Sequence, residues 1–363
     1  MLRLLSIAGT RPEAIKLAPI ALAAPRRAGI EHRLVASGQH DRMFEQVVEA
    51  FGLNVDRRLA LGTPGQSIEM LRQAVSRGVR ALLAEQRPDL VIVQGDTTTA
   101  WAAALAADAA GVPVAHVEAG LRSGDLALPW PEERNRVEID AIATLLFPPS
   151  EQARANLAAE PAVRGQVHVT GNSGIDALLH MRRRIEPRKD RSTRLILATC
   201  HRRENIGAPL LRICAALATL AERPDVRIVL PVHPNPAFRG PIAEALAGHP
   251  RIALVDPLGY PEMVQTLADA HLILSDSGGL QEEAPALGVP LLVLRDNTER
   301  PEPLAAGNML IVGTRSEDIV PSANRLLDDP VAHAAMAIPC FPYGKGDAAD
   351  RMLDVIQAWA AAR

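Results

Sequence analysis

Cysteine is scarce in this sequence, and long hydrophobic runs and basic blocks are absent. The three cysteines, Cys200, Cys214 and Cys340, are scattered, which indicates a reducing compartment without a disulfide framework. We therefore expect a cytoplasmic protein. No apolar run is long enough to cross a bilayer, so no membrane partner is expected. The net charge is -3 and no long basic block occurs, which argues against a nucleic-acid partner.

Several common motifs are also missing. There is no Gly-x-x-x-x-Gly-Lys-Ser/Thr loop, which argues against a nucleotide hydrolase. No His-Glu-x-x-His or paired-cysteine spacing supports a metal site, so we expect no metal and no cofactor. A loose dinucleotide-binding pattern at 344–349 lies near the C-terminus instead of in an early turn, and we interpret it as chance.

The length and composition favour two globular domains. The chain has 363 residues, of which 48% are hydrophobic and 22% are charged, while single cores stop growing at about 250–300 residues. Segment 182–194 is charged and lacks apolar periodicity, which is typical of a linker. We expect an N-terminal domain at 1–181, a C-terminal domain at 182–345, and a last helix within 346–363 that packs back across the junction.

Short apolar runs alternate with longer amphipathic segments along the whole chain. This alternation predicts α/β architecture: two Rossmann-like, parallel-sheet domains that face a central cleft. The expected strands are 3–8, 33–36, 90–94, 114–117, 145–147, 167–170, 195–198, 227–230, 252–255, 272–274, 291–294 and 310–312. The expected helices are 12–27, 42–51, 67–85, 98–110, 150–158, 209–221, 236–247, 260–268, 280–287, 316–327 and 350–361.

A glycine pair follows the expected strand 272–274. Ser277, Gly278 and Gly279 open a helix whose N-terminus would favour an anion. Glu282 and Glu283 are expected in the first helical turn, where a carboxylate suits the dipole and could also bind ribose hydroxyls. An ordinary strand-to-helix turn has similar features. The cationic loop at 295–301, which follows the next strand, favours an anion site here.

Three carboxylates follow strands of the first half. Asp96, Glu118 and Glu132 could each be a helix cap or a surface charge, but together they indicate acid/base chemistry on a sugar. Arg11 and Lys16, after the first strand, could reach a phosphate.

A histidine with neighbouring arginines follows the expected strand 195–198. His201, Arg202 and Arg203 suit a diphosphate leaving group, because arginine forms forked hydrogen bonds and histidine can carry a proton near neutral pH. A second histidine, His233, lies in a proline-rich loop after the strand at 227–230.

These residues resemble the bacterial non-hydrolysing UDP-N-acetylglucosamine 2-epimerases over nearly the whole chain. The matching strings are Gly9–Lys16, Gln39-His40, Gly95–Thr99, His116–Arg122, Pro129–Glu133 with Asn135-Arg136, His201–Asn205, Asp276–Pro285 and Thr298–Pro301. The resemblance implies the two-domain GT-B arrangement, a UDP-sugar substrate, no cofactor and a homodimer. It also implies a reaction in which UDP leaves to give 2-acetamidoglucal and then adds back after protonation on the other face.

The resemblance also assigns residues to roles. The acid/base and supporting set is Asp96, Glu118, Glu132, Arg136 and His201. The substrate contacts are Arg11, Lys16, Ser277, Gly278 and Gly279 for phosphate, Glu283 for ribose, Arg300 in the adjacent motif, and Met263 in the stretch that faces uracil. The residues tied to a second, activating substrate molecule are Gln39, His40, Gln66, Arg202 and His233.

Two departures from the family pattern concern fine substrate preference. Cys200 stands where a small residue is usual, and Gln94 replaces a common histidine before Gly95. The alternatives are an epimerase of a related UDP-2-acetamido sugar, a hydrolysing relative that releases N-acetylmannosamine and UDP, a glycosyltransferase of the same architecture, and a nucleotide-sugar sensor.

Overall fold

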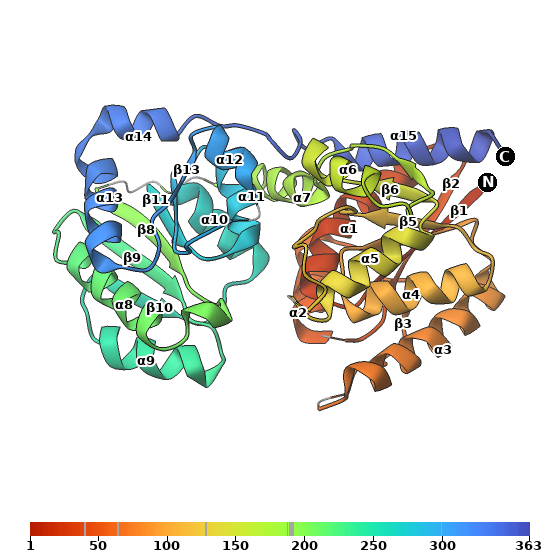
Figure 1. Ribbon diagram of the computed structural model, residues 1–363, viewed down its shortest axis with the longest axis horizontal. Helices are drawn as coiled ribbons and strands as arrows, with labels where there is room; N and C mark the ends of the chain where they lie inside the picture. The colour runs from red at the N-terminus through yellow and green to blue at the C-terminus, as the bar shows by residue number, and fades with distance from the viewer. Residues whose placement is uncertain (40, 64, 128, 187, 189–191, 299) are drawn as a thin grey trace. The chain divides into compact units, whose positions relative to one another are not determined.

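The chain folds into two compact α/β units. The structure is a computed structural model of residues 1–363, and it describes all of them except residues 40, 64, 128, 187, 189–191 and 299. Unit 1 comprises Met1–His180 and Tyr343–Arg363, and unit 2 comprises Met181–Pro342. Each unit contains one parallel sheet with helices on both of its faces (Figure 1).

The sheet of unit 1 has seven strands in the order β3-β2-β1-β4-β5-β6-β7, with parallel pairing throughout its described part. This is the Rossmann order extended by one strand. The direction in which successive strands are added to the sheet reverses between β1 and β4. The strands are β1 (Leu2–Ala8), β2 (Ile30–Ala36), β3 (Arg57–Arg58), β4 (Leu90–Gln94), β5 (Val114–Val117), β6 (Leu145–Phe147) and β7 (Gln166–Val167). The helices are α1 (Arg11–Ala23), η1 (Ala24–Arg26), α2 (Asp41–Phe51), α3 (Ile68–Gln86), α4 (Thr98–Ala109), α5 (Glu132–Ile142), α6 (Glu151–Ala158), α7 (Ser173–Arg182) and α15 (Ala348–Ala361).

The sheet of unit 2 repeats this order with six strands, β10-β9-β8-β11-β12-β13. The direction in which successive strands are added therefore reverses between β8 and β11. The strands are β8 (Arg194–Thr199), β9 (Val226–Pro231), β10 (Ile252–Val255), β11 (Leu272–Ser275), β12 (Leu291–Val293) and β13 (Met309–Ile311). The helices are η2 (Arg203–Asn205), α8 (Ala208–Ala221), α9 (Pro236–Leu246), α10 (Tyr260–Asp269), α11 (Gly278–Leu287), α12 (Pro301–Ala305), α13 (Ser316–Asp328) and α14 (Pro330–Met336).

The central strands of unit 2 are apolar at most positions because both faces of the sheet are covered. On β8, Ile196 packs into one hydrophobic cluster and Leu197 into another. On β11, Leu272 and Ile273 divide between the same two clusters. Successive side chains of a strand point to opposite faces, so this division places one core on each side of the sheet.

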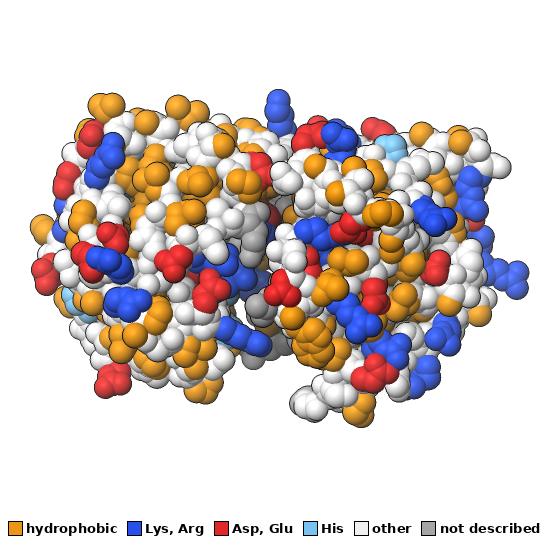
Figure 2. Space-filling model, viewed as in Figure 1, with side chains coloured by type: hydrophobic (Ala, Val, Ile, Leu, Met, Phe, Trp, Pro, Cys, Tyr) orange, Lys and Arg blue, Asp and Glu red, His pale blue; other side chains and the backbone are white. Residues whose placement is uncertain are grey.

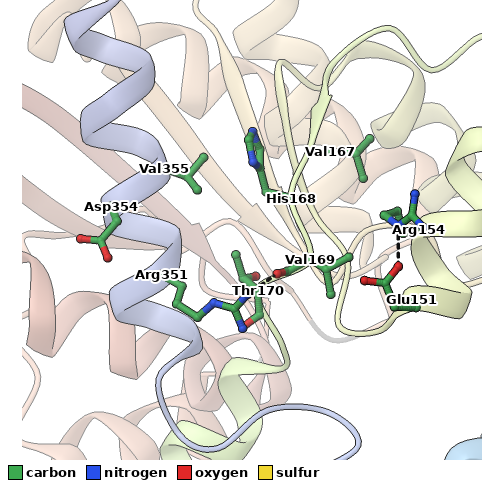
Figure 3. A pocket seen from close by; sticks show the side chains of 9 residues that line it. All are labelled: Glu151, Arg154, Val167, His168, Val169, Thr170, Arg351, Asp354 and Val355. Atoms are coloured by element: carbon green, nitrogen blue, oxygen red, sulfur yellow. Dashed lines mark hydrogen bonds and ion pairs between the residues drawn. The ribbon is translucent and has the colours of Figure 1, made fainter.

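The C-terminal helix α15 belongs to unit 1 and covers the chain that continues from the edge strand β7. The guanidinium of Arg351 donates to the carbonyl oxygens of Val169 at 2.8 Å and of Thr170 at 3.3 Å (Figure 3). These bonds occupy carbonyl groups that would otherwise be available to another strand. The polar hollow beside them has a volume of about 510 Å³ and is lined by Glu151, Arg154, Val167, His168, Val169, Thr170, Arg351, Asp354 and Val355.

The expected fold class, with parallel-sheet α/β domains, is confirmed. Strands β4, β5, β6 and β10 have the predicted bounds. The prediction at 167–170 is wrong in length, because β7 ends at Val167 and the chain then turns to the Arg351 contact. Elements β3, α5, α7, α12 and α14 were not among the expected ones. Across the described residues, every helix is too short or too polar to span a membrane.

Candidate active site

In unit 1, three chain segments leave the sheet at the point where its strand order reverses. Strand β1 leads to Arg11, the first residue of α1, β4 leads to Gly95 and Asp96, and β5 leads to Glu118. The carboxyl ends of parallel strands meet at one edge of a sheet, and ligands bind at such a switch point. The structure therefore brings Arg11, Asp96 and Glu118 to the same edge of unit 1.

Helix α5 is docked on the turn that carries Asp96. The Arg136 guanidinium pairs with the Asp96 carboxylate, and the Asn135 side-chain amide donates to the Asp96 carbonyl oxygen at 2.8 Å. Glu132 is the first residue of α5 and lies four positions before Arg136, so both occupy one helix face. Within the described part of the chain, the Glu132 carboxylate has no hydrogen-bond or ion-pair partner.

Glu118 is held from two sides. Its backbone has a φ of 69°, a left-handed conformation that is uncommon for a residue with a side chain. One carboxylate oxygen pairs with Lys16 and the other accepts a hydrogen bond from the Gln94 amide. Lys16, which we expected at a phosphate, is thus bound to one of the candidate acid/base groups.

A buried glutamate, Glu13, ties two of these segments together. One carboxylate oxygen accepts the backbone N–H groups of Gly9 and Thr10 at 3.0 and 2.8 Å, and the other accepts the Thr97 hydroxyl at 2.7 Å. The loop before Arg11 and the turn after Asp96 are therefore joined by one side chain. Burial raises the pKa of the Glu13 carboxyl to about 7, although hydrogen bonds from Thr97, Gly9 and Thr10 oppose the shift.

In unit 2, a buried aspartate organises the segments that follow β8 and β11. The Asp276 carboxylate is fully buried and accepts the backbone N–H groups of His201 and Arg202, each at 2.9 Å. It also accepts the Asn205 amide at 2.9 Å and lies 3.2 Å from His201 Nδ1. These contacts hold the His201-Arg202 segment against the turn that begins α11.

Two arginines converge on the start of α11. The helix begins at Gly278, and a Cβ atom built there would lie 3.0 Å from the guanidinium groups of both Arg202 and Arg300. Ser277 occupies the N-cap position, but its side chain forms no capping hydrogen bond. A helix start leaves backbone N–H groups for an external acceptor, and the two guanidinium groups add positive charge. This end of α11 is suited to a phosphate.

The expected position of Glu282 and Glu283 within α11 was wrong. Because the helix begins two residues earlier than predicted, both residues lie in its second turn. Glu282 accepts a hydrogen bond from Arg300 Nε at 2.6 Å, so it orients one of the two arginines at the helix start. Gly279 follows Gly278 in the first turn. A Cβ atom built at Gly279 would lie 3.9 Å from the Ser277 hydroxyl oxygen.

His201 lies beside the second predicted histidine, His233. Their ring centroids are 6.5 Å apart and the rings are nearly parallel. Burial lowers the pKa of the His201 imidazole below its ordinary value; Asp276 opposes the shift, and Arg202 and His233 reinforce it. Cys200 is buried, and burial followed by the charge of Asp276 raises its thiol pKa, so it does not have the character of a nucleophile.

The remaining predicted residues are more dispersed. Met263 is partly buried against a hydrophobic cluster of unit 2. Gln39 accepts the Thr99 hydroxyl at 2.8 Å in unit 1, while Gln66 closes a local turn by accepting the Thr63 N–H at 3.0 Å. Glu283 is partly buried on α11. His40 lies outside the described residues.

Sequence reasoning gave no role to several residues that build these sites. Asp276 and Glu13 lie inside sequence strings that resemble the family. His116 and Arg122 are the first and last residues of another such string. The signal was a polar residue at or just after a buried strand. It could have been followed further, because a buried polar group must find a partner.

Two Rossmann-ordered units define a two-domain α/β protein, with carboxylates at the switch point of one unit and arginines at a helix start in the other. The sequence profile of the UDP-N-acetylglucosamine 2-epimerase family matches residues 23–357. The chain belongs to this family.

Individual relatives match over almost their full length. A "Probable UDP-N-acetylglucosamine 2-epimerase" of Ralstonia nicotianae is 44% identical, over 99% of this chain and 100% of that protein. The UDP-N-acetylglucosamine 2-epimerase of Escherichia coli K12 is 42% identical, over 98% of each. The crystal structure of the Neisseria meningitidis UDP-GlcNAc 2-epimerase bound to UDP-GlcNAc has a TM-score of 0.91 at 37% identity, over 98% of this chain and 100% of that one.

Proposed function

We propose that this chain catalyses the reversible C2 epimerisation of UDP-N-acetylglucosamine to UDP-N-acetylmannosamine without releasing the free sugar. The observation that carries the proposal is the set of Asp96, Glu118 and Glu132 at one sheet edge of unit 1. Unit 2 supplies cations and helix N–H groups suited to a diphosphate. Family membership and the UDP-GlcNAc bound to the Neisseria relative support the choice of substrate.

The chemistry requires a leaving group because no carbonyl activates the hydrogen at sugar carbon 2. In the proposed reaction, a carboxylate of unit 1 takes that proton while the bond from carbon 1 to the diphosphate oxygen breaks. The electron pair of the C–H bond forms the C1–C2 double bond of 2-acetamidoglucal, and UDP takes the pair of the broken bond. Protonation of carbon 2 from the opposite face and return of UDP to carbon 1 complete the inversion.

The groups of unit 2 match the charge that develops on UDP. Arg202, Arg300 and the start of α11 would stabilise the departing diphosphate, and such fixed charges are often the largest catalytic contribution. His201, with its lowered pKa, would offer a neutral imidazole beside them. The strings Gln39-His40 and Pro129–Arg136, which resemble those of non-hydrolysing members, favour the non-hydrolysing reaction over the hydrolysing alternative.

Deuterium incorporation tests the proposal. Incubation of the chain with UDP-N-acetylglucosamine in D2O should give UDP-N-acetylmannosamine with deuterium at carbon 2, read by NMR. Asp96→Asn should lower kcat at least about 100-fold with UDP binding kept, because acid/base groups contribute about 10²–10⁴-fold. Asp89→Asn is the matched control, since Asp89 precedes β4 and Asp96 follows it; its kcat should stay within about twofold.

Three outcomes would contradict the proposal. Epimerised product without deuterium would exclude the elimination route. Free N-acetylmannosamine as the main product would identify a hydrolysing enzyme. Turnover only with a second sugar acceptor would identify a glycosyltransferase.

We also propose that the chain forms a homodimer, as its family resemblance implies. Large hydrophobic side chains are exposed on both units, for example Met70 and Trp130 on unit 1 and Leu211 and Val331 on unit 2, and Figure 2 shows hydrophobic side chains on one face of each. Such patches often mark association surfaces. Light scattering should give twice the 38.9 kDa mass of the chain. A mass of one chain at micromolar concentration would exclude a stable dimer.

A further inference from the structure

His116 is fully buried on β5, and both of its ring nitrogens face hydrogen-bond acceptors. Nδ1 lies 2.6 Å from Asp140 Oδ1, and Nε2 lies 2.8 Å from the carbonyl oxygen of Gly95. A carbonyl oxygen can only accept a hydrogen bond, so Nε2 must carry a hydrogen.

The other partner, Asp140, is held as a carboxylate. Its Oδ2 accepts the Gly120 N–H at 3.1 Å and pairs with Arg122 at 2.7 Å. A carboxylate also only accepts, so His116 Nδ1 must carry a hydrogen as well. The ring that satisfies both contacts is the imidazolium.

The cluster around His116 balances its own charge. Arg122 pairs with Asp140 and also with Glu160, whose carboxylate accepts Arg122 Nη2 at 2.9 Å. Two cations therefore face two anions, which is the condition under which a charged group can be kept inside a protein.

His116 fixes the residue that precedes Asp96. Gly95 has a φ of 66° and joins β4 to Asp96. Its N–H donates to the Val117 carbonyl oxygen at 3.0 Å, and its own carbonyl oxygen accepts from His116. Because glycine has the widest backbone freedom, these two contacts help to set the direction of the next side chain, together with the Asn135 and Arg136 contacts to Asp96 itself.

We propose that His116 is a positioning residue for the epimerisation: its imidazolium holds the Gly95 carbonyl group and thereby aims the Asp96 carboxylate. This inference rests on the proposed function, in which Asp96 acts on the sugar. His116 is fully buried, so its proposed role is to hold the backbone and not to contact the substrate.

Two substitutions separate the contacts of the ring. A glutamine amide reaches the position of Nε2 and keeps the donor to Gly95, whereas an asparagine amide reaches the position of Nδ1 and keeps the donor to Asp140. We expect His116→Asn to lower kcat about 100-fold and His116→Gln about tenfold, with KM within about threefold in both, because misplacement of a reacting group by about 1 Å can cost 10²-fold. A role in packing alone would not separate the two variants in this order.

His32→Gln is the matched control in the same unit. His32 lies on β2 and contacts the Ser6 hydroxyl at 2.9 Å. The same change of side chain there should leave kcat within about twofold. Equal losses in His116→Asn and His116→Gln, or a larger loss in His116→Gln, would overturn the proposal.

NMR of the intact chain with 15N-labelled histidine tests the inference without any turnover. At pH 7, His116 should show two protonated ring nitrogens, assigned by the signals that His116→Gln removes. His32 provides a neutral reference in the same spectrum, since burial lowers its pKa to about 4. A neutral His116 ring overturns the inference whether or not the chain epimerises, whereas a failed deuterium experiment with a protonated ring would count against the proposed reaction alone.

Discussion

At the residue scale, Glu13 couples the geometry of unit 1 to its protonation state. Its carboxylate joins the loop before Arg11 to the turn after Asp96 through Gly9, Thr10 and Thr97. Thr10 and Glu13 also form the capping box of α1. The hydrogen bonds favour the ionised form, but burial dominates and raises the pKa from an ordinary 4.5 to about 7.

The raised pKa of Glu13 predicts a pH-dependent stability of unit 1. Between pH 4.5 and about 7 the folded state keeps a proton that the unfolded state has released, so the free energy of unfolding falls as pH rises. The contribution is at most roughly 3 kcal/mol, since each pKa unit corresponds to about 1.4 kcal/mol. Glu13→Gln mimics the protonated form and should remove this part of the pH dependence.

Urea unfolding from pH 5 to pH 8 measures the effect of Glu13. Fluorescence reports on unit 1 alone, because Trp101, Trp130 and Trp359 all lie in it. The stability of the wild type relative to Glu13→Gln should decline up to about pH 7 and then level off. Glu49→Gln, on the exposed face of α2, is the control and should keep the wild-type slope. A constant difference between wild type and Glu13→Gln would show that Glu13 is ionised throughout.

The residues of the candidate site were predictable only in part. Asp96, Glu118 and His201 follow buried strands, and the carboxyl ends of parallel strands share an edge, so sequence order was enough to collect them. The sequence did not reveal that Lys16 pairs with Glu118 or that Asp276 accepts from His201 and Arg202. Such contacts depend on which side chain turns inward, and packing decides that after the chain has folded.

At the element scale, the strands were predictable because helices cover both faces of each sheet. A strand that is buried on both sides is a short, continuous apolar run, as in β4 and β11. Strand β3 has the opposite character. It consists of two exposed arginines whose extended conformation comes from pairing with Val35 and Ala36, so no apolar pattern marks it.

The start of α11 was predicted two residues too late because of its two glycines. Glycine is a poor helix former, so Gly278 and Gly279 were assigned to the turn. In the structure both are helical, and the absence of a side chain at Gly278 leaves room for the Arg202 and Arg300 guanidinium groups. Local propensity favours a turn there, whereas glycine within the helix lets the two guanidinium groups approach closely.

At the scale of the whole molecule, unit 1 is built from both ends of the chain. Residues 1–180 are joined by residues 343–363, which carry α15. Arg27 pairs with Asp350 and Asp354, and Asp176 accepts the Ala349 N–H at 2.8 Å. A sequence pattern reports neighbours along one element, so partners more than 320 residues apart, such as Arg27 and Asp354, could not be read from it.

Burial, more than ion pairing, should hold α15 on unit 1. Leu353 is fully buried, and replacing a buried leucine by alanine costs about 2–5 kcal/mol. The carboxylates of Asp350 and Asp354 are 58% and 63% exposed, and exposed ion pairs contribute about 0–1 kcal/mol each. We therefore expect Leu353→Ala to lower the free energy of unfolding of unit 1 by at least about 2 kcal/mol. The double variant Asp350→Asn/Asp354→Asn should lower it by less than Leu353→Ala does, and by at most about 2 kcal/mol for the two pairs together.

Urea unfolding followed by tryptophan fluorescence decides between these two contributions, because Trp359 lies on α15 itself. Leu353→Ala should shift the midpoint of the unfolding transition to a lower urea concentration. Trp101, Trp130 and Trp359 should still report a single, common transition. If the double charge variant were the more damaging one, the Arg27 pairs would anchor the helix instead. If Leu353→Ala released an early transition that involves Trp359 alone, α15 would be a separately folding segment. A single shifted transition means that the C-terminal helix folds as part of the core that begins with β1.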